Sequence, residues 1–160
     1  MARPPTLAEV ARITRENGFD YAMALDEFCD EFYLDHPNKA AQQHRIDPVP
    51  EPVGDPLADA WIGAAGEHLA LRWGLRVPAW AHRAVHFALD VPHFLPASKP
   101  LRGIVIVESP PAFRSRLIFT RAEPLERARF PRDVPRAAVP LPWPPPEEAD
   151  ETAAAAKRLP

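Results

Sequence analysis

Hydrophobic residues recur at helical spacing in the first part of the chain. Between residues 6 and 17 they fall on one side of a helix, and Thr6 with Glu9 forms a capping box at its start. Gly18 follows as a stop, because glycine adopts the left-handed conformation at low cost. A second stretch, 21–34, again places its apolar residues at i, i+3 and i+4. The short connection between the two stretches predicts a helical hairpin.

The strongest helical signal covers residues 56–73. Asp55 is a capping residue and Gly74 a stop, so both ends of this helix are marked. Gly63 and Gly66 interrupt it, although each glycine costs a helix about 1 kcal/mol relative to alanine. We therefore expect another helix to approach closely at these two glycines.

Prolines divide the remainder of the chain into short pieces. Residues 98–108 begin like a helix, although the β-branched run 103–107 also fits a buried strand. The start signal favours the helix. The other predicted elements, in chain order, are a short turn at 38–45, an apolar segment at 79–88, a helical turn at 112–116, an extended piece at 117–120 and a last helix at 121–129 capped by Thr120.

Prolines and acidic residues dominate the end of the chain. Seven of residues 131–146 are prolines, and an acidic cluster follows them. Such a segment is typical of disorder or of a chain wrapped on a surface. The predicted fold is therefore all-α: a compact bundle of five to six helices in one domain, 1–130, and a proline-rich, acidic disordered tail, 131–160.

Composition excludes several classes of protein. A length of 160 residues fits one domain, since domains usually run to about 100–150 residues. One cysteine excludes an internal disulfide framework, a thiolate zinc cluster and an iron–sulfur site. No apolar run approaches the ~20 residues that span a bilayer, and the first residues do not resemble a signal peptide. We expect a cytoplasmic protein that does not insert in a membrane.

Charge is unevenly distributed. Residues 1–35 hold three arginines and eight acids, a net −5, whereas residues 101–136 hold eight arginines and four acids, a net +4. This asymmetry can steer a partner, or the acidic helices can face the basic half within the fold. A net charge of +4 on this block is small. Nucleic-acid-binding domains are typically basic enough to have a pI above ~9.

Three histidines are the weak candidates for a metal site. His82 and His86 are four residues apart and share a face if 79–88 is helical, and His68 follows Glu67 on the 56–73 helix. Such a set can bind zinc and support a hydrolase. The H-E-x-x-H motif is absent, however, because position 83 is arginine. The pattern favours ordinary packed or surface histidines, and we expect no cofactor.

Catalytic motifs are otherwise missing. The acidic run 26–31 favours a solvated or partner-facing helix surface over a catalytic carboxylate pair. The sequence contains neither a phosphate-binding glycine loop nor a nucleophile elbow. The sequence thus indicates a protein that is not an enzyme.

Two segments are suited to binding a macromolecule. The first alternates arginine and aromatic residues, which dominate protein interfaces and can also bind nucleic acid. The second, 141–146, is preformed as polyproline II and carries an aromatic anchor. The predicted partner-binding residues are Phe113, Arg114, Arg116, Phe119, Arg121, Leu141 and Trp143. The acidic face 26–31 is a third candidate contact.

Several short runs resemble one protein family. They include Gly18-Phe-Asp-Tyr-Ala, Gly54-Asp-Pro, Ala65-Gly-Glu-His-Leu-Ala70, Gly74-Leu-Arg-Val-Pro-Ala-Trp80 and Glu108-Ser-Pro-Pro-Ala-Phe-Arg-Ser-Arg. Over about residues 6–129 the chain resembles a family of small helical proteins from GC-rich bacteria. In that family the domain occurs alone or appended to a helix-turn-helix regulator, beside a nucleotidyltransferase-like gene proposed as a toxin.

The resemblance implies an antitoxin-like or regulatory protein that binds a partner. The chain departs from the family at Val91-Pro-His-Phe94, where Pro-Trp-Phe is expected, and it has no clear helix-turn-helix, which argues against direct operator binding. No functional residue is established for the family, so none is carried over. We predict a non-enzymatic module that binds a partner protein, possible partners including a toxin encoded nearby. The alternatives are a nucleic-acid-binding regulator, a zinc-dependent hydrolase and a structural module.

Overall fold

A single buried helix, α4 (Pro56–Trp73), lies at the centre of the all-α fold. The computed structural model describes residues 2–135. Asp55 caps α4 by accepting a hydrogen bond from the Leu57 N–H at 3.2 Å. The Asp59 carboxylate accepts two more backbone bonds, from Val53 at 2.8 Å and Gly54 at 3.2 Å. Of the 18 residues of α4, 13 are buried, so other elements must cover it on nearly every side.

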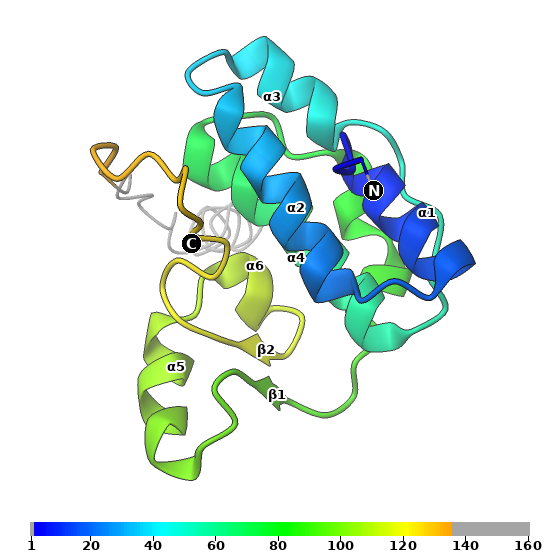
Figure 1. The fold of residues 1–160 in the computed structure, drawn as a ribbon. Coiled ribbons are helices and arrows are strands. Elements are labelled where there is room, and N and C mark those ends of the chain that lie inside the picture. The colour runs from blue at the N-terminus through cyan, green and yellow to red at the C-terminus, as the bar shows by residue number, and fades with distance from the viewer. Residues whose placement is uncertain (1, 136–160) are drawn as a thin grey trace, which may run out of the picture.

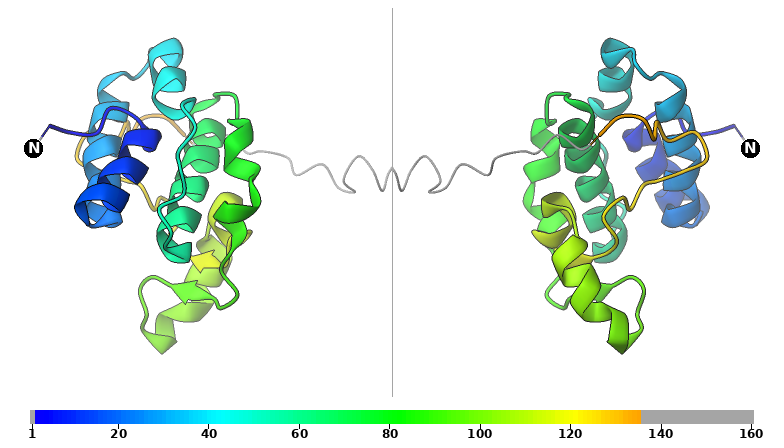
Figure 2. Two further views of the ribbon diagram at one scale, coloured as in Figure 1. Left: turned by 90° about the vertical axis from the view of Figure 1, so that its right-hand side faces the viewer. Right: turned by 90° about the vertical axis from the view of Figure 1, so that its left-hand side faces the viewer.

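The first three helices cover one side of α4. They are α1 (Leu7–Asn17), α2 (Tyr21–Leu34) and α3 (Lys39–Ile46), the blue to cyan part of Figures 1 and 2. Aromatic rings join the layers, since Tyr33 of α2 packs edge-on against Trp73 of α4 with 5.8 Å between ring centroids. The helices bury their apolar faces in one core with α4.

Short elements cover the opposite side of α4. They are the 3₁₀ helices η1 (Ala79–His82) and η2 (Ala84–Phe87) and the one-turn helix α6 (Pro111–Arg114). Strands β1 (His93–Phe94) and β2 (Ile118–Phe119) form a two-residue parallel pair. Between them the chain runs through η3 (Lys99–Leu101) into α5 (Arg102–Glu108), which projects from the body of the molecule in Figures 1 and 2.

Local sequence signals correctly predict the long helices. Thr6 caps α1 by accepting from the Glu9 N–H at 3.1 Å, and Gly18 ends it with φ of 62°. The helices predicted over 21–34 and 56–73 are confirmed as α2 and α4. The run that fits either helix or strand, 103–107, lies in helix α5.

The two glycines of α4 mark close approaches, as expected, but 3₁₀ helices approach there instead of an α-helix. A Cβ added at Gly63 would lie 2.5 Å from Cβ of His86 in η2. One added at Gly66 would lie 2.6 Å from the Trp80 ring in η1. These distances are too short for any other residue type without movement of the neighbouring element.

The prediction of a last helix over residues 121–129 is wrong. These residues form turns, with no helix. Leu125 and Phe130 are both buried, and on a helix two residues five positions apart would point about 140° apart. The irregular course lets both reach the core, where the Leu125 carbonyl accepts from the Tyr33 hydroxyl at 2.7 Å. Burial therefore overrides the local capping signal of Thr120.

The described chain continues five residues into the predicted tail. Arg72 of α4 donates to the Val134 carbonyl at 2.8 Å, so residues 131–135 follow the surface of the domain. Residues 136–160, which include Leu141 and Trp143, lie outside the described residues.

We expect Gly63→Ala to destabilise the protein although alanine is the better helix former. The new Cβ collides with His86, and overpacking of this kind costs about 1–3 kcal/mol. Gly103→Ala in α5 is the matched control, because nothing lies within 4 Å of its added Cβ. The control should gain about 0.5–1 kcal/mol in the free energy of unfolding, measured by chemical denaturation. Equal effects of the two exchanges would contradict the close approach at Gly63.

Candidate functional site

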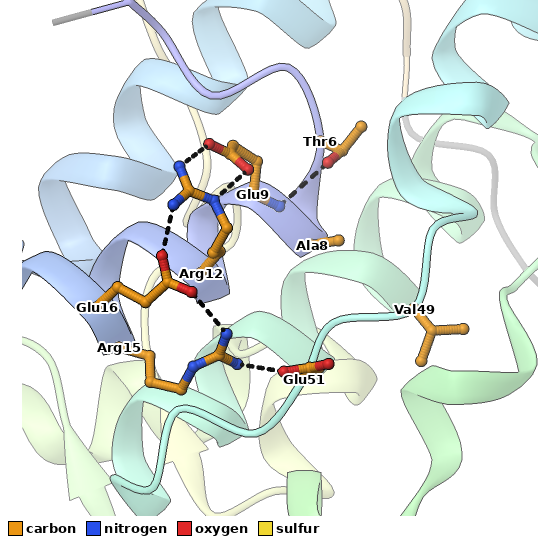
Figure 3. Close-up of a pocket in the computed structure, with 8 residues that line it drawn as sticks. All are labelled: Thr6, Ala8, Glu9, Arg12, Arg15, Glu16, Val49 and Glu51. Carbon is orange, nitrogen blue, oxygen red and sulfur yellow. Dashed lines mark hydrogen bonds and ion pairs between the residues drawn. The ribbon is translucent and has the colours of Figure 1, made fainter.

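A surface hollow between α1 and the segment 49–51 is filled with paired charges (Figure 3). Arg12 donates to Glu9 at 2.5 Å and to Glu16 at 2.6 Å. Arg15 bridges from Glu16 at 3.2 Å to Glu51 at 2.9 Å. A charged ligand would have to displace these pairs, so the hollow offers little to bind one.

Arg116, just after α6, is the largest fully buried side chain of residues 2–135. It is 1% exposed and stacks on the Phe87 ring, with 4.2 Å from Cζ to the ring centroid. Its Nη1 donates to Glu67 Oε2 and to the Ala112 carbonyl, both at 2.6 Å, and its Nη2 donates to the Ala81 carbonyl at 2.6 Å. Burial lowers the pKa of Arg116, and the Glu67 carboxylate opposes that shift. This guanidinium therefore joins α4, η1, η2 and α6.

The structure separates His82 and His86. The chain is extended at Arg83, with ψ of 146°, so η1 and η2 are two separate turns. The prediction that His82 and His86 share one helix face is therefore wrong. The His82 side chain is 58% exposed and lies 3.5 Å from Glu67. His86 is 1% exposed, and its Nδ1 donates to the Asp59 carbonyl at 2.7 Å because a carbonyl can only accept.

His68 packs inside the domain. Its ring lies edge-on to Phe113, with 5.5 Å between centroids. Across residues 2–135, no three His, Cys, Asp or Glu side chains are placed together to hold a metal ion. The three histidines thus occupy three different environments, and the zinc-hydrolase alternative finds no ligand set in this part of the chain.

The predicted arginine–aromatic contact set divides into a buried and an exposed part. Phe113 and Arg116 are at most 1% exposed, so they hold the fold and are not available to a partner at the surface. Arg114 and Arg121 are exposed and Phe119 is half-buried. The sequence could not distinguish these two roles, since all five residues share one pattern.

The acidic face 26–31 is already paired within the molecule. Arg127 lies 3.4 Å from Asp26 and 3.1 Å from Asp30, and Arg3 pairs with the two glutamates of the run. Arg127 of the basic half therefore faces the acidic helix α2, which supports the internal interpretation of the charge asymmetry, whereas Arg3 belongs to the acidic segment itself.

Helix α5 carries an apolar surface that the sequence analysis missed. Val105 is the one residue of α5 that is buried, at 3% exposure. The exposed fractions of its neighbours are 52% for Ile104, 44% for Ile106 and 76% for Val107, and Leu101 just before the helix is 41% exposed. We call Leu101, Ile104, Ile106 and Val107 the α5 face. Its signal in the sequence is the absence of any polar residue in 103–107, because a lone edge helix cannot bury every side.

The base of α5 is fixed to the body by aromatic and hydroxyl contacts. Phe94 of β1 stacks on Phe119 of β2 with 5.1 Å between ring centroids, and the Arg102 guanidinium lies 4.8 Å from the Phe94 ring. At the other end of α5, Ser109 Oγ accepts from the Thr120 N–H at 2.7 Å and donates to the Val105 carbonyl. The α5 face is therefore presented on an anchored helix.

Comparison with known proteins identifies no relative of this chain. No protein-family model, no curated protein and no solved structure matches the chain. Within the described part of the chain, no helix has the length and apolar character needed to cross a bilayer.

Replacement of Arg116 by glutamine should destabilise the protein by about 3 kcal/mol, because removing one partner of a buried ion pair leaves the other uncompensated. Arg114→Gln is the matched control. Within residues 2–135 the Arg114 side chain makes one hydrogen bond, to the Ser109 carbonyl at 2.8 Å, and its loss should cost less than about 1 kcal/mol. Urea denaturation of both variants tests the assignment, which fails if Arg116→Gln is as mild as the control.

We expect stability to fall as pH drops below about 6.5, because of His86. Burial lowers the pKa of His86 below its ordinary value of 6.5, so the unfolded chain takes up a proton that the folded chain resists. The contribution is complete above the unfolded pKa and is lost as pH falls toward the folded pKa, by up to about 1.4 kcal/mol per pH unit. His86→Gln should flatten the dependence of the unfolding free energy on pH between 7 and 5. A pH dependence that is as steep in His86→Gln as in the wild type would contradict the assignment.

Proposed function

We propose that the protein is a protein-binding module and that the α5 face is its contact surface. The observation that carries the proposal is the outward side of α5, which is apolar where a surface helix is normally polar. Three exposed β-branched residues add nothing to the stability of a short helix, since β-branched side chains are weaker helix formers than alanine or leucine. Contiguous exposed apolar side chains of this kind typically mark interaction sites. A partner that covers the α5 face accounts for their presence.

Exposed charged residues flank the α5 face at both ends. Lys99 and Arg102 make its start basic, whereas its end carries the acid Glu108 together with Arg114, which bonds to the Ser109 carbonyl. An apolar centre with a charged rim is the usual anatomy of a protein interface. The surface therefore suits a partner with an apolar centre and acidic residues opposite Lys99 and Arg102, and the exposed Arg114 of the predicted contact set lies at its other end.

The structure favours a protein partner over nucleic acid. Single-stranded nucleic acid needs aromatic platforms for its bases and a basic groove for its backbone. Phe113 is buried, and Phe119 is already stacked on Phe94. The exposed side chains in the middle of α5, Ile104, Ile106 and Val107, are aliphatic, which suits protein side chains better than bases.

The finer proposal is an antitoxin-like role. It rests on the sequence runs that resemble a bacterial family encoded beside a nucleotidyltransferase-like gene proposed as a toxin. Under this proposal the partner is that enzyme, and the module inhibits it by binding. The cytoplasmic location belongs to the same proposal.

The test is co-purification of the tagged full-length chain from its native host. The wild-type protein should retain a stoichiometric partner, and Val107→Asp should lose it, because a carboxylate at the centre of the α5 face is buried by binding. Met23→Asp on α2, at a position that is 58% exposed, is the matched control and should retain the partner. A wild-type chain that purifies alone contradicts the proposed function, and equal retention by both variants contradicts the assigned surface.

Growth rescue tests the antitoxin-like role. Expression of the partner gene alone should slow growth, and co-expression of this chain should restore it. Co-expression of Val107→Asp should fail to restore growth while Met23→Asp succeeds. A partner that is harmless when expressed alone contradicts the antitoxin-like role but leaves the binding module intact.

A further inference from the structure

The α5 face is unpartnered among the described residues, and the chain carries a segment that complements it. Residues 136–160 contain Leu141 and Trp143, followed by an acidic cluster. We propose that in the free protein the segment 141–151 folds back over the α5 face and must be displaced by a binding partner. This inference rests on the contact surface proposed above and adds a regulatory occupant of that surface.

Apolar and charged residues follow one another along the segment in an order that matches their order along α5. Apolar residues come first, at 141–143, and four acids follow within 147–151. On the domain, the apolar side chains of α5 lie between Ser109 at one end and the basic residues Lys99 and Arg102 at the other. A segment that enters near Ser109 and runs toward Lys99 places apolar on apolar and acid on base.

The point where the described chain ends favours this direction. The Val134 carbonyl bonds to Arg72, whose Nε donates to Glu123 at 3.0 Å. Three residues before Glu123, the Thr120 N–H bonds to Ser109 at the end of α5. Short links thus connect Val134 to the C-terminal end of α5, and three extended residues span at most about 11 Å.

The length of the segment also fits. Trp143 follows Pro135 by eight residues, which in the polyproline II conformation span roughly 25 Å. Helix α5 has seven residues and is therefore about 10 Å long. The first acid comes four residues after Trp143, or about 12 Å further along an extended chain. With the indole over the α5 face, the acidic cluster reaches the Arg102 end of the helix.

Proline reduces the entropic cost of this contact. Residues 140–146 contain five prolines, which restrict the segment before it binds. Attachment to the same chain also gives the segment an effective concentration of about millimolar, so weak contacts suffice. A separate partner molecule with stronger contacts can still displace it.

Fluorescence of Trp143 in the purified full-length chain tests the proposal without any partner. The difference between wild type and Trp143→Phe isolates this indole from the three tryptophans of the domain, Trp61, Trp73 and Trp80. The difference spectrum should show blue-shifted emission and weak quenching by acrylamide. Val107→Asp should shift the emission to longer wavelength and raise quenching severalfold, whereas the control Met23→Asp should change neither.

Two further measurements separate the possible occupants. The Trp143 signal should be the same at low and high protein concentration, and Glu147→Lys with Glu148→Lys should expose the indole because it reverses the charge match with Lys99 and Arg102. A solvent-exposed indole in the wild-type protein overturns the proposal. Protection that appears only as concentration rises, together with dimers in sedimentation, overturns it in favour of a second copy of the chain. Either failure leaves the co-purification result unaffected, so the two proposals fail separately.

Discussion

The buried guanidinium of Arg116 is the contact on which the second half of the fold depends. It bonds to Glu67 on the central helix and to carbonyls of η1 and α6, so these two short elements share one anchor on α4. A buried cation is stable only when its partners are in place, because desolvation of an unpaired charge is costly. Gly63 makes room for this arrangement, since an added Cβ there would lie 3.1 Å from Arg116 Nε. The glycine and the arginine thus form one constraint.

The anchor also positions the surface to which we assign function. Leu117, directly after Arg116, has φ of 61°, a left-handed conformation that costs a non-glycine residue roughly 1–2 kcal/mol. That turn brings Ile118 and Phe119 beside β1, and its carbonyl accepts from the His93 N–H at 2.8 Å. Helix α5 lies between β1 and β2 in the chain, so the position of the α5 face depends on Arg116. The packing of the core and the position of the proposed contact surface are therefore coupled through a few residues of chain.

Features that depend on neighbours in sequence could be predicted, and features that depend on distant contacts could not. Caps and glycine stops lie within a turn of the helices they define, which is why α1, α2 and α4 were found. The shared face of His82 and His86 failed because the extended Arg83 breaks the segment into two turns. Arg116 and Arg114 look alike in sequence, and their different burial is set by Glu67, 49 positions away. The apolar run in α5 indicated burial, whereas its place at the edge of the fold leaves most of it exposed.

The composition of α5 has a consequence for the unfolded and partly unfolded chain. Ile104-Val-Ile-Val107 is uncharged and strongly β-forming, and segments of this kind add readily to the edges of other strands when released from a helix. The sequence on either side limits that hazard. Pro100 and Arg102 precede the run, and Glu108 with two prolines follows it, so charges and missing N–H donors stop a cross-β stack from extending. An exposed surface made of β-branched residues is thus tolerated because its flanking residues act as gatekeepers against aggregation.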